Sequence, residues 1–250
     1  MSDFTWHGVY YSDLQSPFAL LVVPLAFLAW RAAVPTREER AVVPEAARFV
    51  AGMTLAFAFL TMLDPVSTGP LLRSDLLANG PATTIIPFFF VLLGDLRVLW
   101  LALGVARPDR SLASQLLRAL GLSLIVPVFA GATYGVTRLL VPEVHSQLLW
   151  MLYEAGFLVL CILLSRRWAA RALRDAPATE SYVQALLGFS AAYYVLWLAA
   201  DLLIVVGGLD LGWAVRIVPN QLYYSFWVPF AYWRFFAVSP DPSCAGKAVR

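Results

Sequence analysis

Charged residues are scarce in this chain. Asp, Glu, Lys and Arg make up only 14% of its 250 residues, whereas an ordinary soluble domain is about one quarter charged. Apolar residues make up 60%, the mean hydropathy is +0.72, and runs of about 18 or more apolar residues recur along the chain. A soluble domain of this length would need far more polar surface to cover its core. The composition therefore predicts an integral membrane protein, and we expect no nucleic-acid partner.

Cysteine and histidine are nearly absent, and each absence excludes a kind of site. Cys161 lies in an apolar run and Cys244 in a polar tail, so neither a disulfide framework nor a cysteine metal site is expected. His7 and His145 both map to the external side, which excludes haem held by paired histidines inside the bundle and a Ser–His dyad. No HExxH motif and no glycine-rich phosphate loop occur. The sequence thus predicts no metal ligand, no catalytic residue and no direct use of ATP, and it leaves the cofactor unknown.

The apolar residues gather into seven segments separated by charged or Pro- and Gly-rich breaks. Each segment is long enough to cross about 30 Å of hydrocarbon as a helix rising 1.5 Å per residue. We therefore predict an all-α, seven-transmembrane-helix bundle over residues 16–238, with an external segment at 1–15 and a polar cytoplasmic tail at 239–250. The predicted helices are Pro17–Ala33, Arg48–Asp64, Thr84–Ala106, Leu116–Thr137, Leu148–Ser165, Tyr182–Val206 and Leu211–Ala237.

The basic residues predict the orientation, because basic loops resist translocation. With seven helices, one side of the membrane has three arginines, Arg73, Arg138 and Arg216, and Arg97 lies within a span. The other side has fourteen basic residues, so we expect the N-terminus outside and the C-terminus in the cytoplasm, in a plasma membrane such as the bacterial inner membrane. The fourteen are Arg31, Arg37, Arg40, Arg48, Arg107, Arg110, Arg118, Arg166, Arg167, Arg171, Arg174, Arg234, Lys247 and Arg250.

Two charged residues lie at the middle of the third predicted helix. A charge at the centre of a membrane span costs about 2.5–3.5 kcal/mol on insertion scales and is a candidate functional residue. Asp95 and Arg97 are two positions apart, so their side chains point about 200° apart around the helix. They cannot face each other, and each is predicted to have a partner on another helix or in water.

The other polar groups within the predicted spans converge toward the external side. Glu154 lies slightly outward of the centre of the fifth helix, and Asp201 lies in the outer part of the sixth. Helical spacing places aromatic residues on the same faces, so we predict an aromatic ligand- or ion-binding cavity in the outer half of the bundle. A break in the seventh helix at Pro219 would expose backbone there. The candidate binding residues are Asp95, Arg97, Glu154, Asp201, Arg216, Asn220, Gln221, Tyr194, Trp197 and Tyr224.

Each of these residues also has a purely structural explanation. Tyr and Trp near helix ends commonly form the belt at the membrane surface. Asp95 and Arg97 could belong to an interhelical network that only fixes the bundle, and Asp64 and Arg216 lie close enough to the interface to be simply solvated.

The seven-helix plan with an external N-terminus resembles that of rhodopsin-like proteins and of small sugar- or amino-acid carriers in topology only, and topology does not decide function. Among these, the retinal proteins carry a covalently bound chromophore. Their chromophore is bound through a Schiff base to a lysine of the last helix. Lys247 is the only lysine of this chain and lies in the polar tail, so covalently bound retinal is excluded.

Three functions remain open, and an enzyme is the less expected outcome. The first is a carrier that moves a small organic substrate or ion across the membrane. The second is a receptor-like or pigment- or lipid-binding bundle that holds an apolar ligand among aromatic residues that include Trp100 and Trp150. The third is a structural subunit of a larger membrane complex, with lipids and another membrane protein as partners. An aspartyl hydrolase would need Asp95 to meet Asp201 or Glu154.

Overall fold

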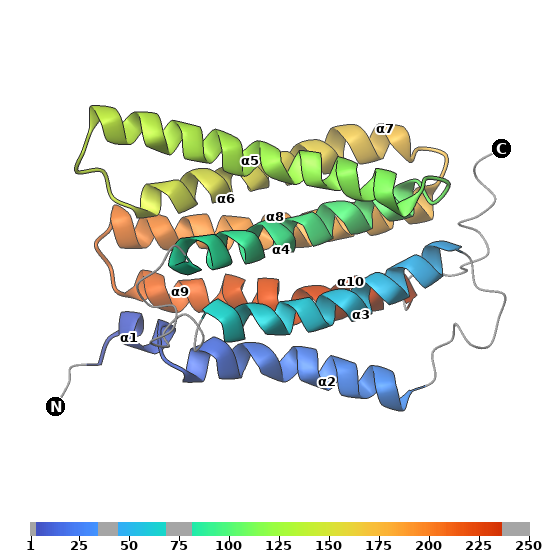
Figure 1. The fold of residues 1–250 in the computed structure, drawn as a ribbon, viewed down its shortest axis with the longest axis horizontal. Coiled ribbons are helices and arrows are strands. Elements are labelled where there is room, and N and C mark those ends of the chain that lie inside the picture. The colour runs from blue at the N-terminus through green and yellow to red at the C-terminus, as the bar shows by residue number, and fades with distance from the viewer. Residues whose placement is uncertain (1–3, 35–44, 69–81, 237–250) are drawn as a thin grey trace.

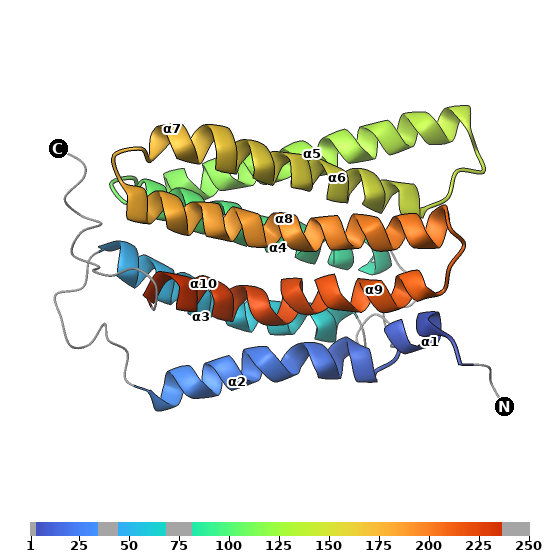
Figure 2. The same cartoon turned by 180° about the vertical axis from the view of Figure 1, so that it is seen from behind.

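The computed structural model describes residues 4–34, 45–68 and 82–236, and within these ranges every regular element is a helix. The long helices run along one common axis (Figures 1 and 2). Elements marked η are π-helical, with backbone hydrogen bonds that span one residue more than in an α-helix. The elements are α1 (Trp6–Tyr10), η1 (Leu14–Ala19), α2 (Leu20–Ala33), α3 (Glu45–Val66), α4 (Ala82–Ala106), α5 (Leu112–Leu140), α6 (Gln147–Leu163), η4 (Leu164–Ala169), α7 (Ala170–Ala172), α8 (Pro177–Val205), α9 (Leu211–Asn220), η5 (Gln221–Phe226) and α10 (Trp227–Phe236).

The seven predicted segments are all helical, with ends that differ from the prediction by a few residues in most cases. The largest difference is in the fifth, where α6, η4 and α7 continue to Ala172. The predicted break at Pro219 is wrong, because α9 passes directly into η5 and α10. Helix α1 is not predicted. The predicted polar tail at 239–250 lies outside the described residues.

Within the described ranges, five helices are long and apolar enough to cross a membrane, whereas the sequence predicts seven spans. Large apolar side chains on them are exposed, including Leu117 at 68%, Phe129 at 65% and Leu139 at 84%. Soluble proteins rarely expose large apolar patches. The all-helical fold is therefore suited to membrane insertion. The five are Glu45–Val66, Ile85–Ala106, Leu112–Leu140, Gln147–Ala172 and Pro177–Val205, and a shorter apolar helix covers Pro17–Ala33.

Helix α4 has a buried centre that packs against three neighbouring helices, α3, α5 and α8. The six consecutive residues from Gly94 to Leu99 are all buried. A helix buried on every side cannot turn a charged residue toward water. Asp95 and Arg97 must therefore be stabilised by partners on the surrounding helices.

Gly94 allows the close contact between α4 and η5. Tyr223 crosses α4 at this glycine and donates a hydrogen bond to the carbonyl oxygen of Val91 at 3.3 Å. A methyl group on Gly94 would overlap the hydroxyl group and the ring of Tyr223. Tyr223 is only 3% exposed, so its ring has little room to move.

We expect Gly94→Ala to lower the free energy of unfolding by roughly 1–3 kcal/mol, the usual cost of overfilling a packed core. Gly131→Ala in α5 is the matched control, because nothing lies within 4 Å of a methyl group at that position. There the gain in helix propensity should stabilise the protein by up to about 1 kcal/mol. Equilibrium unfolding in mixed micelles measures both values, and an equal effect of the two substitutions would contradict the packing explanation.

Candidate ligand-binding site

A cavity of about 180 Å³ lies in the half of the bundle that carries α1. Its wall is contributed by α1, α4, α6, α8, α9 and η5, so no single helix forms it. Seven of its eleven lining residues are Tyr or Trp, and Val91 is the single aliphatic one. The lining residues are Tyr10, Val91, Trp150, Tyr153, Glu154, Tyr194, Trp197, Arg216, Asn220, Tyr223 and Tyr224.

The exposure of the lining residues defines an outer rim and a floor. At the rim, Tyr10, Arg216 and Asn220 are partly exposed. At the floor, Tyr194 and Tyr223 are 2% and 3% exposed. The cavity therefore has a partly exposed rim formed by α1 and α9 and a buried aromatic floor formed by α8 and η5.

Asp95 holds two of the cavity tyrosines in place. Its carboxylate accepts hydrogen bonds from the hydroxyl groups of Tyr153 on α6 and Tyr194 on α8. The ring of Tyr194 also stacks on Phe157, with centroids 5.5 Å apart. Asp95 is 2% exposed and does not line the cavity. Its partners are tyrosines and not a second carboxylate, so the pairing that an aspartyl hydrolase requires is not formed.

An ion pair between neighbouring helices lies at the cavity wall. Arg216 on α9 contacts the carboxylate of Asp201 on α8, which is 0% exposed. The side-chain amide of Gln147 donates to the other oxygen of Asp201 at 2.7 Å. Glu154 lies 4.0 Å from Arg216, but its second carboxylate oxygen, Oε2, is buried and has no hydrogen-bond partner in the described part of the chain. Glu154 at the wall and Asp201 behind it thus provide two carboxylates for one guanidinium group.

Hydrogen bonds between side chains fix the rim of the cavity. The amide oxygen of Asn220 accepts from the indole N–H of Trp197 at 2.9 Å, and its NH₂ group donates to the hydroxyl oxygen of Tyr10 at 3.2 Å. Asn220 therefore connects α8, α9 and α1 at one point. The guanidinium carbon of Arg216 lies 5.8 Å from the centre of the Tyr10 ring, so the same tyrosine also contacts the ion pair.

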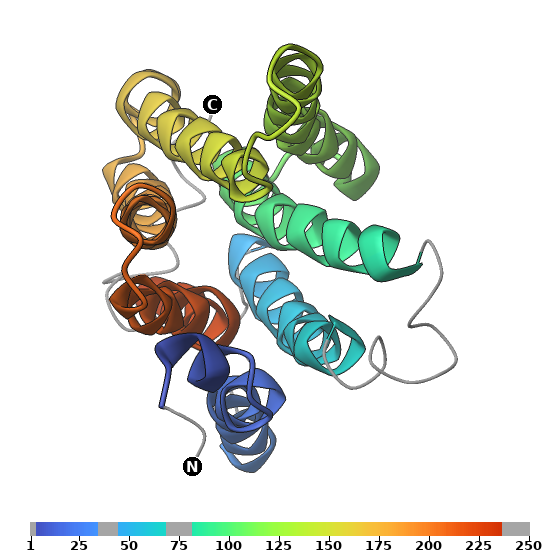
Figure 3. The ribbon, with the colours of Figure 1, turned by 90° about the vertical axis from the view of Figure 1, so that its left-hand side faces the viewer.

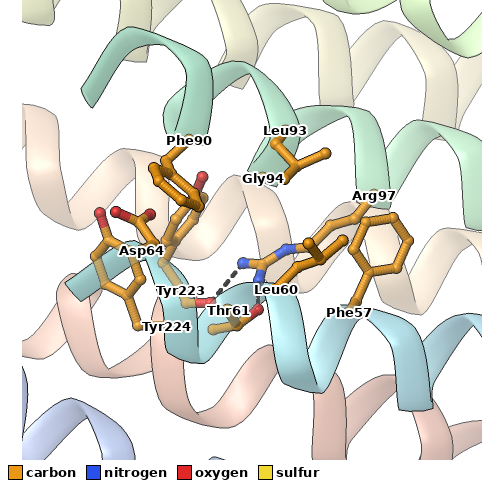
Figure 4. Close-up of a pocket in the computed structure, with 10 residues that line it drawn as sticks. All are labelled: Phe57, Leu60, Thr61, Asp64, Phe90, Leu93, Gly94, Arg97, Tyr223 and Tyr224. Atoms are coloured by element: carbon orange, nitrogen blue, oxygen red, sulfur yellow. Dashed lines mark hydrogen bonds between the residues drawn. The ribbon is translucent and has the colours of Figure 1, made fainter. Parts of the chain in front are cut away.

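Arg97 lies on the opposite side of α4 from Asp95, in a second and much smaller cavity of about 10 Å³ (Figure 4). It donates to the hydroxyl oxygen of Thr61 on α3 at 2.7 Å and to the carbonyl oxygen of Tyr223. Its guanidinium carbon is 4.5 Å from the centre of the Tyr223 ring and 4.7 Å from that of Trp227. The prediction that Asp95 and Arg97 have separate partners on other helices is therefore confirmed.

Asp64, near the end of α3, also lines the small cavity. Its carboxylate accepts a hydrogen bond from Thr68 at 3.3 Å, and in Figure 4 it lies beside Tyr223 and Tyr224. These two tyrosines line both cavities, so they form the wall between them. The volume of the small cavity is about that of one water molecule.

Helix α1 lies at the end of the bundle that carries the α8–α9 connection, and it packs against α9 (Figure 3). Asp210 holds it there, because its carboxylate accepts from the backbone N–H groups of Trp6 at 2.6 Å and His7 at 3.0 Å. The rings of His7 and Tyr10 pack on Trp213, with centroids 4.8 and 5.2 Å apart. This attachment brings Tyr10 onto the rim of the cavity.

We expect Asp210→Ala to release α1 from α9. The first N–H groups of a helix have no partner within the helix, and loss of a cap typically costs about 1 kcal/mol. Hydrogen exchange of the amides of Trp6 to Tyr10 should accelerate roughly tenfold, since 1.4 kcal/mol corresponds to a factor of ten. Asp175→Ala, at an exposed position near the opposite end, is the control. Unchanged exchange in Asp210→Ala would mean that the aromatic contacts alone hold α1.

Six of the ten predicted binding residues line the larger cavity: Glu154, Arg216, Asn220, Tyr194, Trp197 and Tyr224. Three others act at a distance from it, because Asp95 and Asp201 hold lining residues and Arg97 lines the smaller cavity. Gln221 does not line either cavity and instead accepts from Ser225 at 2.8 Å. Trp100 also lies elsewhere, with its ring 6.3 Å from that of Phe57.

Three lining tyrosines are absent from the predicted set. Tyr153 directly precedes the predicted Glu154 on the same helix, and this adjacency is the one sequence signal that points to it. Tyr223 adjoins the predicted Tyr224, and in η5 both residues contact the cavity. Tyr10 precedes the first predicted span, and no pattern in the sequence places it at this site. Among the described residues, no group of three or more His, Cys, Asp or Glu residues is placed to hold a metal ion.

No protein-family model, curated protein sequence or solved structure matches the chain.

Proposed function

We propose that this chain is a polytopic membrane protein that binds a small organic molecule in the aromatic cavity and carries it across the membrane. The observation that supports binding is a cavity of about 180 Å³ whose wall combines seven aromatic side chains with Glu154 and Arg216. An engineered apolar cavity of about 150 Å³ binds benzene. The cavity therefore suits a ligand of one ring with a short polar substituent.

The proposed orientation places α1 and the cavity rim outside, with seven spans. Ten of the described arginines lie in the half of the bundle away from α1, and two, Arg138 and Arg216, lie in the α1 half. This distribution agrees with the rule that basic residues stay in the cytoplasm. Labelling of single cysteines introduced at Glu143 and Asp109 with an impermeant reagent tests it, because only the first should react in intact cells. The ten are Arg31, Arg48, Arg107, Arg110, Arg118, Arg166, Arg167, Arg171, Arg174 and Arg234.

A buried core below the cavity floor is the arrangement that an outward-facing carrier would have. Phe157, Tyr193 and Trp227 are 2%, 0% and 0% exposed and fill the centre of the bundle beneath the tyrosines. Carriers alternate access around a site near the middle of the membrane. A second, inward-facing arrangement of the helices would open this closed side.

A non-transporting binding protein is the second candidate, and the closed core is equally compatible with it. If the core below the floor never opens, the cavity only holds its ligand. The two functions share the site and differ in whether the ligand crosses the membrane.

Native mass spectrometry of protein extracted gently from its own membrane tests the binding site. We expect the wild-type protein to retain a small molecule and Trp197→Leu, which alters the cavity wall, to lose it. Trp100→Leu is the matched control, because Trp100 lies outside the cavity. Uptake of the identified molecule into the lumen of protein-containing liposomes then distinguishes a carrier from a binding protein, because only a carrier moves the molecule across the membrane. If no bound molecule distinguishes the wild-type protein from Trp197→Leu, the cavity is not a ligand site.

A further inference from the structure

The cluster of Glu154, Arg216 and Asp201, of which the first two line the cavity, carries one more negative than positive group in its ionised form. Asp201 contacts Arg216 directly and neutralises its charge. Glu154 is 4% exposed and lies at 4.0 Å from the same guanidinium group, and its Oε2 atom has no hydrogen-bond partner among the described residues. A buried carboxylate oxygen without a partner is costly and is satisfied by a donor from water, a proton or a ligand. The Glu154 carboxylate therefore lacks a hydrogen-bond donor, which a positively charged ligand would supply.

The composition of the wall favours the same kind of ligand. All seven aromatic side chains that line the cavity are Tyr or Trp, none is Phe, and only one lining residue is aliphatic. The ring faces of Trp and Tyr attract cations, and the attraction increases when water is excluded. Two rings of the lining already make such cation–π contacts, since Arg97 lies over Tyr223 and Arg216 lies near Tyr10. A cavity for a purely apolar molecule has no need of a buried carboxylate.

We propose that the cavity binds a small organic cation, with its ammonium group at the Glu154 carboxylate and its apolar body among Trp150, Trp197 and Tyr194. This assignment rests on the proposed function of the cavity as a ligand site and specifies the class of ligand. The volume admits about one ring with a one-carbon substituent, which limits the cation to the size of a benzylammonium ion.

The test compares three ligands of nearly equal size and different charge: benzylammonium, benzyl alcohol and benzoate. Binding is measured from the tryptophan fluorescence of the full chain in phosphatidylcholine nanodiscs, with empty nanodiscs as the blank. We expect benzylammonium to bind at least tenfold more tightly than benzyl alcohol, and benzoate to bind most weakly. The order is measured on the wild-type protein, so it does not depend on the folding of any variant.

Glu154→Gln should reduce the affinity for benzylammonium to that for benzyl alcohol and leave the affinity for benzyl alcohol unchanged. Glu143→Gln is the matched control, because Glu143 is exposed in the α5–α6 connection and should preserve the preference for the cation. A preference that survives in Glu154→Gln overturns the assignment of the ammonium group to this carboxylate.

The remaining outcomes separate this inference from the proposed function. If benzyl alcohol or benzoate binds at least as tightly as benzylammonium, and Trp150→Ala abolishes that binding, the cavity is a ligand site but the ligand is not a cation. If none of the three shows saturable binding, both the cation and the ligand site are rejected.

Discussion

Asp201→Asn should lower the free energy of unfolding by about 3 kcal/mol. Removal of one partner from a buried ion pair typically costs about 3–5 kcal/mol, because the remaining charge stays buried without compensation. Asp201 is 0% exposed and contacts Arg216 directly. We expect the lower end of that range, since Glu154 at 4.0 Å still compensates part of the charge of Arg216. Equilibrium unfolding in mixed micelles measures the loss.

A double-mutant cycle distinguishes the ion pair from a general packing effect. Arg216→Gln in the Asp201→Asn background removes the uncompensated charge, so the double variant should be no less stable than Asp201→Asn alone. Asp175→Asn, at an exposed position, should change the stability by less than about 0.5 kcal/mol. Additive losses in the double variant would show that the two residues act independently.

Asp95→Ala should lower the free energy of unfolding by about 2–3 kcal/mol and weaken ligand binding as well. The substitution removes two hydrogen bonds between helices, each worth about 1–2 kcal/mol in membrane proteins at the upper end of measured values. The hydroxyl groups of Tyr153 and Tyr194 would lose their buried acceptor. Because both tyrosines line the cavity, their altered positions should also reduce the affinity for benzylammonium by roughly tenfold, equivalent to about 1.4 kcal/mol.

Two comparisons check this role of Asp95. Tyr194→Phe removes one of the two hydrogen bonds and keeps the ring, so it should lose about half as much stability as Asp95→Ala. Asp109→Ala, in the exposed α4–α5 connection, should have no measurable effect on stability or binding. Normal ligand affinity in Asp95→Ala would show that Asp95 is only a structural contact and does not position the cavity tyrosines.

The positions of the helices follow from the sequence because they depend on local composition. A helix that crosses hydrocarbon must be apolar over about 20 residues, and charged residues mark its ends. All seven predicted segments are helical for this reason. Helix α1 has only five residues and is too short to give such a signal. A distant residue, Asp210, holds it in place. The predicted break at Pro219 failed because one missing N–H group does not end a helix that its neighbours support.

The opposite directions of Asp95 and Arg97 were also determined by the sequence alone, since a spacing of two residues on a helix fixes the angle between side chains. The tertiary structure decided which residues they meet: Tyr153 and Tyr194 for Asp95, and Thr61 and Tyr223 for Arg97. It likewise turned Gln221 away from the cavity and brought Tyr10 onto its rim. These contacts join residues 36 to 210 positions apart. They depend on how far each helix is rotated and where it packs, and no local pattern in the chain contains that information.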